Sequence, residues 1–376
     1  MKNILLFCLV LLLVCYGCGA SGYSVKITML QERIENADYK TAKAEIIKLI
    51  DEYPGRPEPY YLLGLINFGA EKYYECLSNF DEAERRDIEK THEFYLKRGI
   101  ALYETGNNVE AEKNLLMSET LMQSGTAQKY LGLILYELGD YSGSIEAFMR
   151  TSSINDEPEV LYVYGMALYH EGMNSESLEI LMRAYEISPE DDVDENILFQ
   201  TANLLMLAGG YNPAIVMYSQ IPDGSAYAPE SMYNSAEAYI KLGDFDSAER
   251  LLERYIKLQP DDYESLLNLS SVLIQTGKYV YAADILSNLL EKGYGVKAIY
   301  NYGLVNHKLG KYAESVHYLA EAAALNPRNV EYLYAYGLTL TEYGDIEKAK
   351  TQMETVMTLD PGNEDAAEWL NQQVME

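Results

Sequence analysis

The side chains best suited to catalysis or metal binding are few in this sequence and stand far apart. The four histidines show none of the spacings that place metal ligands on one helix face, such as H-E-x-x-H; they are His92, His170, His307 and His317. The chain also lacks the phosphate-binding G-x-x-x-x-G-K-[ST] loop and the G-x-S-x-G nucleophile turn. We therefore expect no enzyme activity, no metal and no cofactor, with His307 and His317 on solvated helix faces.

One cluster of carboxylates has the ligand type that calcium prefers; it consists of Glu190, Asp191, Asp192, Asp194 and Glu195. The cluster lacks the alternating spacing and the glycine of a calcium loop, which favours a solvated loop instead. Residues 151–240 contain fifteen acidic residues and one basic residue, Arg183. An acidic surface of this kind can serve solubility alone. The alternative is that it attracts a basic partner, which the neighbouring aromatic residues would also suit.

Net charge and composition restrict the classes of partner and fold. The 376 residues include 29 basic and 58 acidic ones, a formal charge of −29, which excludes nucleic acid as a partner because its phosphates would be repelled. The hydrophobic share of 48% is typical of a folded protein. Three of the four cysteines precede Gly19, so the remainder cannot build a disulfide framework or a four-thiolate zinc site. We expect the fourth, Cys76, to be a buried and inert thiol.

The N-terminal segment has the pattern of an export signal. Lys2 precedes an unbroken apolar run over residues 4–15, which is too short to span a bilayer, and small residues follow it. The step Gly17-Cys18-Gly19 resembles the lipobox of bacterial lipoproteins, although Cys15 stands where that family usually has leucine. The resemblance implies a signal peptide over 1–17, lipidation at Cys18 and a lipidated tether over 18–25. Cleavage after Ala20 without lipid, a retained anchor and a cytoplasmic protein are the alternatives.

The rest of the chain repeats with a period near 34 residues. Eight glycines carry this period, with spacings of 33 to 37 residues: Gly106, Gly139, Gly172, Gly209, Gly243, Gly277, Gly310 and Gly344. A small residue follows each glycine by five positions, as Ser177 follows Gly172, and another precedes it by seven, as Gly165 does. Extending the frame towards the N-terminus adds two units, with small residues at Ala42 and Cys76, although Glu71 replaces the turn glycine of the second.

These positions predict pairs of short helices joined by a tight turn. The glycine can adopt the left-handed conformation that ends a helix, and the aspartate after it, as at Asp140, can cap the next one. The two small residues of each unit would let the two helices approach closely. Prolines follow the second helix of several units and stop it; these are Pro54, Pro189, Pro260, Pro327 and Pro361.

The period and the small, aromatic and proline positions resemble the tetratricopeptide repeat over residues 23–361. The resemblance implies an all-α protein, a right-handed superhelical solenoid of about ten helical hairpins over 26–361. Leucines replace the early aromatic of the first helix in several units, at Leu161, Leu198 and Leu333. Residues 362–376 place Ala366, Trp369, Leu370 and Val374 on one face, which predicts a C-terminal capping helix.

The same resemblance implies that the first helix of each unit lines a concave, partner-binding groove. The aromatic residues expected there are Tyr61, Tyr103, Tyr136, Tyr162, Tyr169, Phe199, Tyr233, Tyr300 and Tyr334, interleaved with leucines and methionine. Tyrosine combines apolar contact area with a hydrogen-bonding tip, a composition favoured at protein interfaces. The alternative for each ring is packing between adjacent units. A carboxylate clamp of the kind some family members use for chaperones is not visible, because Lys129 lacks its companion asparagine.

Two functions remain open from the sequence. The first is a lipid-anchored scaffold at the outer face of a bacterial membrane that holds a protein or peptide partner, possibly basic, in its groove during envelope assembly or secretion. The second is a sensor or regulator that binds a short peptide or a saccharide and changes its curvature. Crosslinking followed by copurification separates them, because a scaffold retains a protein and a small-ligand sensor does not.

Overall fold

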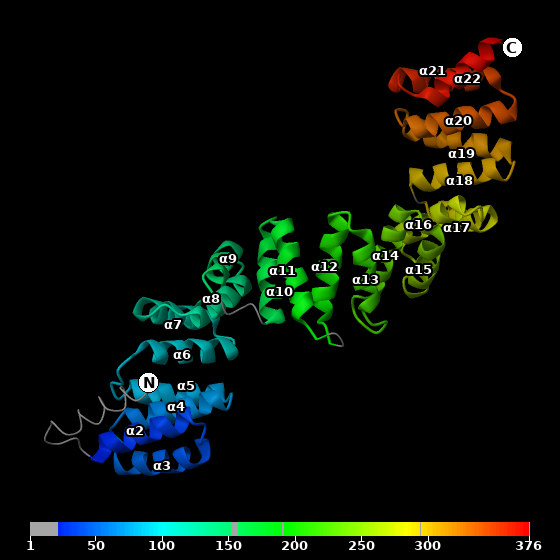
Figure 1. Ribbon diagram of the computed structural model, residues 1–376. Coiled ribbons are helices and arrows are strands. Elements are labelled where there is room, and N and C mark those ends of the chain that lie inside the picture. Colours follow the sequence, from blue (N-terminus) through cyan, green and yellow to red (C-terminus); the bar gives the residue numbers. More distant parts are fainter. Residues whose placement is uncertain (1–21, 152–156, 190–191, 294, 376) are drawn as a thin grey trace. The chain divides into compact units, whose positions relative to one another are not determined.

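A computed structural model describes residues 22–151, 157–189, 192–293 and 295–375 of the chain (Figure 1). The described residues form helices only, α2 to α22, and contain no strand. The fold class predicted from the repeat pattern, an all-α stack of about ten helical hairpins, is confirmed. None of the described helices is long and apolar enough to cross a membrane.

The chain divides into two compact units, Met1–Ser188 and Pro189–Glu376. The first contains five hairpins: α2 (Gly22–Glu35) with α3 (Tyr39–Glu52), α4 (Glu58–Gly69) with α5 (Tyr73–Glu84), α6 (His92–Glu104) with α7 (Asn108–Leu121), α8 (Gly125–Glu137) with α9 (Tyr141–Met149), and α10 (Pro158–His170) with α11 (Asn174–Ile187). Helix α2 therefore starts four residues before the expected start of the array at residue 26. The signal peptide expected over 1–17 and Cys18 lie outside the described residues.

The second unit contains five more hairpins and a final helix. They are α12 (Glu195–Leu207) with α13 (Tyr211–Gln220), α14 (Ala228–Leu242) with α15 (Phe245–Leu258), α16 (Tyr263–Gln275) with α17 (Tyr279–Glu291), α18 (Val296–Lys308) with α19 (Tyr312–Leu325), α20 (Val330–Tyr343) with α21 (Ile346–Leu359), and then α22 (Glu364–Met375). Helices α18 to α21 lie side by side in one stack (Figure 1). Ala366 and Trp369 of α22 are buried against α20 and α21, as expected of a cap.

The turn between the two helices of a hairpin has the predicted conformation. All eight repeating glycines have a positive φ, between 73° and 93°. Glu71, which replaces the glycine in the second hairpin, adopts the same conformation with φ 57°. Asp140 Oδ1 accepts a hydrogen bond from the Gly143 amide at 2.9 Å and so caps α9. The missing glycine therefore leaves the array uninterrupted, at the cost of a strained non-glycine residue.

The two helices of a hairpin approach closely at the small residues, as predicted. A Cβ added at Gly165 in α10 would lie 2.7 Å from Leu181 Cδ2 in α11, so any side chain there would force Leu181 to shift. The Ser177 hydroxyl, fully buried at the same crossing, donates to the Gly165 carbonyl at 2.7 Å. The pairs Ser144–Gly132 and Ser315–Gly303 repeat this hydrogen bond at 2.7 Å. In these hairpins the second small residue therefore joins the two helices as well as leaving room for them.

Candidate functional site

The candidate site is the surface formed by the first helices of successive hairpins within each unit, called here the first-helix surface. First helices of neighbouring hairpins contact one another, as α2 does with α4 and α16 with α18, so their side chains form continuous rows. The nine predicted aromatic residues lie three or ten positions before the turn residue of their hairpins. Two are buried, Phe199 and Tyr300, with 4% and 7% exposure, and Tyr169 is the most open at 39%. The other six are half-buried: Tyr61, Tyr103, Tyr136, Tyr162, Tyr233 and Tyr334.

Several of these rings pack against the next hairpin. The Tyr300 ring is stacked on Tyr332 with centroids 4.2 Å apart, and its hydroxyl donates to Glu331 Oε1 at 3.0 Å. Phe199 is stacked on Tyr227 with centroids 4.6 Å apart. The Tyr103 hydroxyl donates to Glu137 at 3.1 Å. For these residues the packing alternative describes what the structure shows, and Phe199 and Tyr300 have little surface left for a partner.

Tyr61 has a different environment. Its ring is stacked on Phe80 with centroids 5.5 Å apart, and its buried hydroxyl has no hydrogen-bond partner among the described residues. Burial, and then the negative charge of Glu93, raise the pKa of Tyr61 well above its usual range, so the hydroxyl is a proton donor at neutral pH. An unpaired buried hydroxyl is costly, which makes Tyr61 a ready donor for a ligand carbonyl or carboxylate.

A cavity of about 250 Å³ adjoins Tyr61 on the first-helix surface of α2, α4 and α6. Its lining combines apolar, aromatic and charged residues: Gln31, Ile34, Glu35, Tyr39, Tyr61, Leu65, Phe68, Gly69, Glu93 and Lys97. The Lys97 ammonium lies 4.6 Å from the centroid of the Phe68 ring. A partly apolar cavity with a cation and an unpaired donor can take one side chain or the end of a peptide.

In the second unit a row of amide side chains crosses the first-helix surface. Asn234 of α14 donates to Asn203 Oδ1 of α12 at 3.1 Å, and Asn268 of α16 donates to the Tyr233 hydroxyl at 3.0 Å. Asn301 of α18 donates to Ser271 Oγ at 3.1 Å. Each amide therefore uses its nitrogen on the preceding hairpin and is held in a fixed orientation. All three residues are half-buried.

Sequence reasoning missed this row because it concentrated on aromatic residues. The signal was present nine positions before the turn glycine, where four consecutive hairpins carry an amide: Gln200, Asn234, Asn268 and Asn301. The same position holds Leu62, Lys97, Tyr130 and Val163 in the first unit. The row of amides is therefore a feature of the second unit. We call Asn234, Asn268 and Asn301 the amide row.

The acidic cluster lies at the start of the second unit. Glu190 and Asp191 are outside the described residues. Asp194 accepts a hydrogen bond from the Asn196 amide at 2.7 Å and caps α12, and Glu195 accepts one from the Ser225 hydroxyl. Asp192, Asp194 and Glu195 line an open cavity of about 580 Å³ together with Gln220 and Pro222. Among the described residues no group of histidine, cysteine or carboxylate side chains could hold a metal ion.

The remaining reactive groups serve packing. Cys76 is fully buried, and burial raises the pKa of its thiol to about 12, which makes it inert as expected. His317 is exposed as predicted, but His307 is half-buried, with Nδ1 3.0 Å from the Thr339 hydroxyl of the next hairpin. Burial lowers the pKa of His307, so this ring is neutral at pH 7. Lys129, the one lysine considered for a carboxylate clamp, pairs with Glu157 at 3.0 Å.

Stacked hairpins with such rows define a helical-repeat scaffold, a class whose surfaces receive peptide or protein partners. The family model for the tetratricopeptide repeat matches residues 233–293 and 307–371, which is about one third of the chain. The chain thus contains tetratricopeptide repeats, as the glycine and small-residue spacing indicated.

Two curated relatives match less than half of the chain. A TPR repeat-containing protein of Methanocaldococcus jannaschii is 24% identical over 164 residues, which is 43% of this chain and 29% of that protein. A BBSome complex member of Bos taurus is 25% identical over 160 residues, 42% of this chain and 31% of that protein. The chain therefore covers less than one third of the length of either relative.

Solved structures with a similar fold include MamA of Desulfovibrio magneticus RS-1, from residue 41 onward. It is 18% identical, with a TM-score of 0.42, over 47% of this chain and 98% of MamA. YrrB, a TPR protein with an unusual peptide-binding site, is also 18% identical, with a TM-score of 0.43, over 51% of this chain and 97% of YrrB. These likenesses concern the helical-hairpin fold.

Proposed function

We propose that this protein is a non-catalytic scaffold that binds an extended peptide segment of a protein partner on its first-helix surface. The observation that supports this most directly is the amide row Asn234, Asn268 and Asn301, in which each nitrogen is hydrogen-bonded to the preceding hairpin. The oxygen of such an oriented carboxamide can accept a hydrogen bond from a peptide N–H whatever the peptide's side chains are. The row would supply affinity, and neighbouring rings such as Tyr233 would supply side-chain selection.

Removing amides from the row is expected to weaken peptide binding by a similar factor for peptides of different sequence. Each lost hydrogen bond is worth about 0.5 to 1.5 kcal/mol, so Asn268→Ala with Asn301→Ala should raise the Kd about tenfold. The measurement uses several unrelated peptides selected from a random library on the wild-type full chain, with Kd determined by calorimetry or fluorescence anisotropy.

The matched control is Asn288→Ala, an exposed asparagine of α17 that lies outside the row. It should leave every Kd unchanged. Wild-type affinity of the double variant for all selected peptides would reject a backbone grip by the amide row, and losses confined to one peptide would place recognition in side chains.

A second candidate function, a sensor for a short peptide, is favoured by the cavity beside Tyr61. At about 250 Å³ it matches one side chain or a peptide terminus rather than a long segment. Lys97 supplies a positive charge there and the Tyr61 hydroxyl an unused donor. Copurification after crosslinking distinguishes the two functions, because a scaffold retains a protein partner.

We also propose that the scaffold is exported and lipid-anchored through Cys18 at the outer face of a bacterial membrane, in envelope assembly or secretion. The support is the sequence pattern alone: Lys2, the apolar run and Gly17-Cys18-Gly19. With Cys18→Ala, the protein should move from the membrane fraction to the soluble fraction, because it loses the cysteine that would carry the lipid. Fractionation and N-terminal mass spectrometry measure this.

The control for the anchor experiment is Cys76→Ala, which changes a buried thiol and should leave fractionation unaltered. Membrane retention of Cys18→Ala, together with a wild-type N-terminus free of lipid mass, would contradict the anchor. That result would leave the proposed peptide-binding surface untouched.

A further inference from the structure

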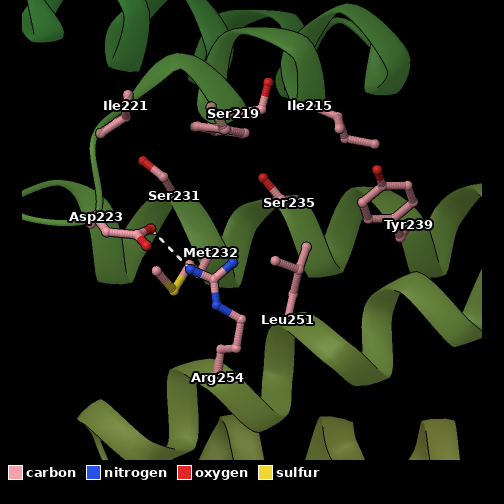
Figure 2. A pocket seen from close by; sticks show the side chains of 12 residues that line it. Ile215, Ser219, Ile221, Asp223, Ser231, Met232, Ser235, Tyr239, Leu251 and Arg254 are labelled. Carbon is pink, nitrogen blue, oxygen red and sulfur yellow. Dashed lines mark hydrogen bonds and ion pairs between the residues drawn. The ribbon is translucent and has the colours of Figure 1, made fainter.

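A second cavity lies within the hairpins of the second unit, between α13, α14 and α15, and it belongs to no row described above (Figure 2). Its volume is about 210 Å³. The lining residues are Ile215, Tyr218, Ser219, Ile221, Asp223, Ala228, Ser231, Met232, Ser235, Tyr239, Leu251 and Arg254. At about 30 Å³ per water, this space holds roughly seven waters or a ligand of similar size.

The cavity is bordered by a small residue at a position where most hairpins have a large one, although the preceding hairpin has Thr201 there. Ser235 stands eight positions before the turn glycine Gly243. In six other hairpins this position holds leucine or tyrosine: Leu63, Leu131, Tyr164, Leu269, Tyr302 and Tyr336. Tyr164, for example, packs against Phe148 in the second helix of the preceding hairpin, with ring centroids 5.3 Å apart. With serine there, the space stays open and one wall becomes polar.

The polar wall carries an unused hydrogen-bonding group. Ser231 is only 4% exposed, and its hydroxyl has no hydrogen-bond partner among the described residues. Ser265, at the same position of the next hairpin, donates to the Asp262 carbonyl at 2.9 Å. Ser231 and Ser235 lie one helical turn apart on α14, and Figure 2 shows both hydroxyls pointing into the space towards α13. A buried hydroxyl without a partner is costly, so this wall is suited to a polar ligand group.

The other walls are partly apolar, and the charges at the rim are paired. Tyr218, Ser219 and Tyr239 also bring hydroxyl groups to the lining. Ile215, Ile221, Met232 and Leu251 contribute hydrocarbon and a thioether. Arg254 forms an ion pair with Asp223 at 2.9 Å, so the rim adds no net charge. A charged ligand would therefore lack a counterion.

We propose that this cavity binds a phenol group, either free or as the tyrosine side chain of a partner. A phenol hydroxyl can both donate to and accept from Ser231 and Ser235, and its ring can pack on the apolar part of the lining at Ile215, Met232 and Leu251. The ring gains contacts with the Met232 sulfur and lies within reach of the Arg254 guanidinium, both favourable for aromatic rings. This proposal does not depend on the peptide surface proposed above.

The test is a titration of the full chain, with labelled methyl groups, by p-cresol as the phenol probe. Saturable shifts are expected at Ile215, Ile221, Met232 and Leu251. Toluene, which lacks the hydroxyl, should bind at least fivefold more weakly, and mannitol should cause no saturable shift. N-acetyltyrosine amide distinguishes the sources: its binding indicates a tyrosine side chain, and binding of p-cresol alone indicates a free phenol.

Two variants and one control make the test specific. Ser235→Leu restores the residue type found at Leu269 and should weaken p-cresol binding at least tenfold by filling the cavity. Ser231→Ala keeps the space but removes the hydroxyl, so p-cresol should bind no better than toluene. Ser265→Ala, at the matching position of the next hairpin, should leave binding unchanged. Absence of saturable shifts in the wild type, or unchanged binding in both variants, would show a cavity that holds only water and overturn the proposal.

Discussion

Gly165→Leu is expected to destabilise its hairpin more than any other single change considered for this chain. A Cβ alone would lie 2.7 Å from both Cγ and Cδ2 of Leu181 and 3.5 Å from the Ser177 carbonyl oxygen, and leucine adds three more carbons. Overpacking of this kind costs roughly 1 to 3 kcal/mol or more. Because repeat units contact mainly their neighbours, the loss should be local. Hydrogen exchange should show it centred on α10 and α11 and fading along the first unit.

The control is Gly55→Leu, in the loop between α3 and α4, where an added Cβ meets nothing within 4 Å. It should leave exchange in α10 and α11 unchanged. Adding Leu181→Ala to Gly165→Leu should recover part of the stability, since the new leucine can occupy the vacated space. Equal loss of protection in every hairpin of both units would instead mean one cooperative core and would contradict the repeat account.

The fold could be predicted because each hairpin repeats the same contacts. Each repeating position has one local role. The structure confirms the positive φ of a turn glycine at Gly172, the close helix crossing at Gly165 and the helix cap at Asp140. Glu71 shows that one residue can depart from the pattern without changing it, since it adopts a positive φ itself. Because the same positions recur in about ten hairpins, the pattern could be recognised in the sequence despite such exceptions.

The site was less predictable because it depends on contacts between hairpins. Phe199 and Tyr233 occupy equivalent positions, but Tyr227 covers Phe199 and leaves it 4% exposed, while Tyr233 stays half-buried. Tyr300, a tyrosine at the same position as Tyr233, is also buried, with 7% exposure, because Tyr332 stacks on it, so residue type alone does not decide exposure. The amide row was visible in aligned repeats, whereas the unpaired hydroxyl of Ser231 could be found only from its surroundings.

Neutralising the acidic cluster is expected to slow the association of a basic partner about tenfold at low salt. Asp192, Asp194 and Glu195 line one open cavity, and the chain around them carries almost no basic residues. Charged clefts raise the association rates of oppositely charged partners by roughly 10 to 1,000-fold. The probe is an arginine-rich decapeptide, and the variant replaces the cluster, Glu190 and Asp191 included, by asparagine or glutamine. Stopped-flow rates are measured at low and high salt.

These substitutions preserve the local structure, so a change in rate reports charge. Asparagine is as good a helix cap as aspartate, so Asp194→Asn keeps the start of α12, and Glu195→Gln can still accept from Ser225. The control neutralises five exposed carboxylates elsewhere in the second unit: Asp284, Glu314, Glu321, Glu347 and Glu354. Both variants have the same net charge, which isolates the effect of position.

The salt dependence decides between steering and solubility. Charges more than about 8 Å apart are screened at physiological ionic strength, so the wild-type rate should fall steeply with salt and approach that of the cluster variant. The control should keep most of the wild-type rate and slope, because its charges lie on other hairpins. If the association rate falls equally in the cluster variant and in the control variant, net charge alone attracts the peptide. If neither changes the rate, the cluster is a solvated surface that keeps the chain soluble and takes no part in binding a basic partner.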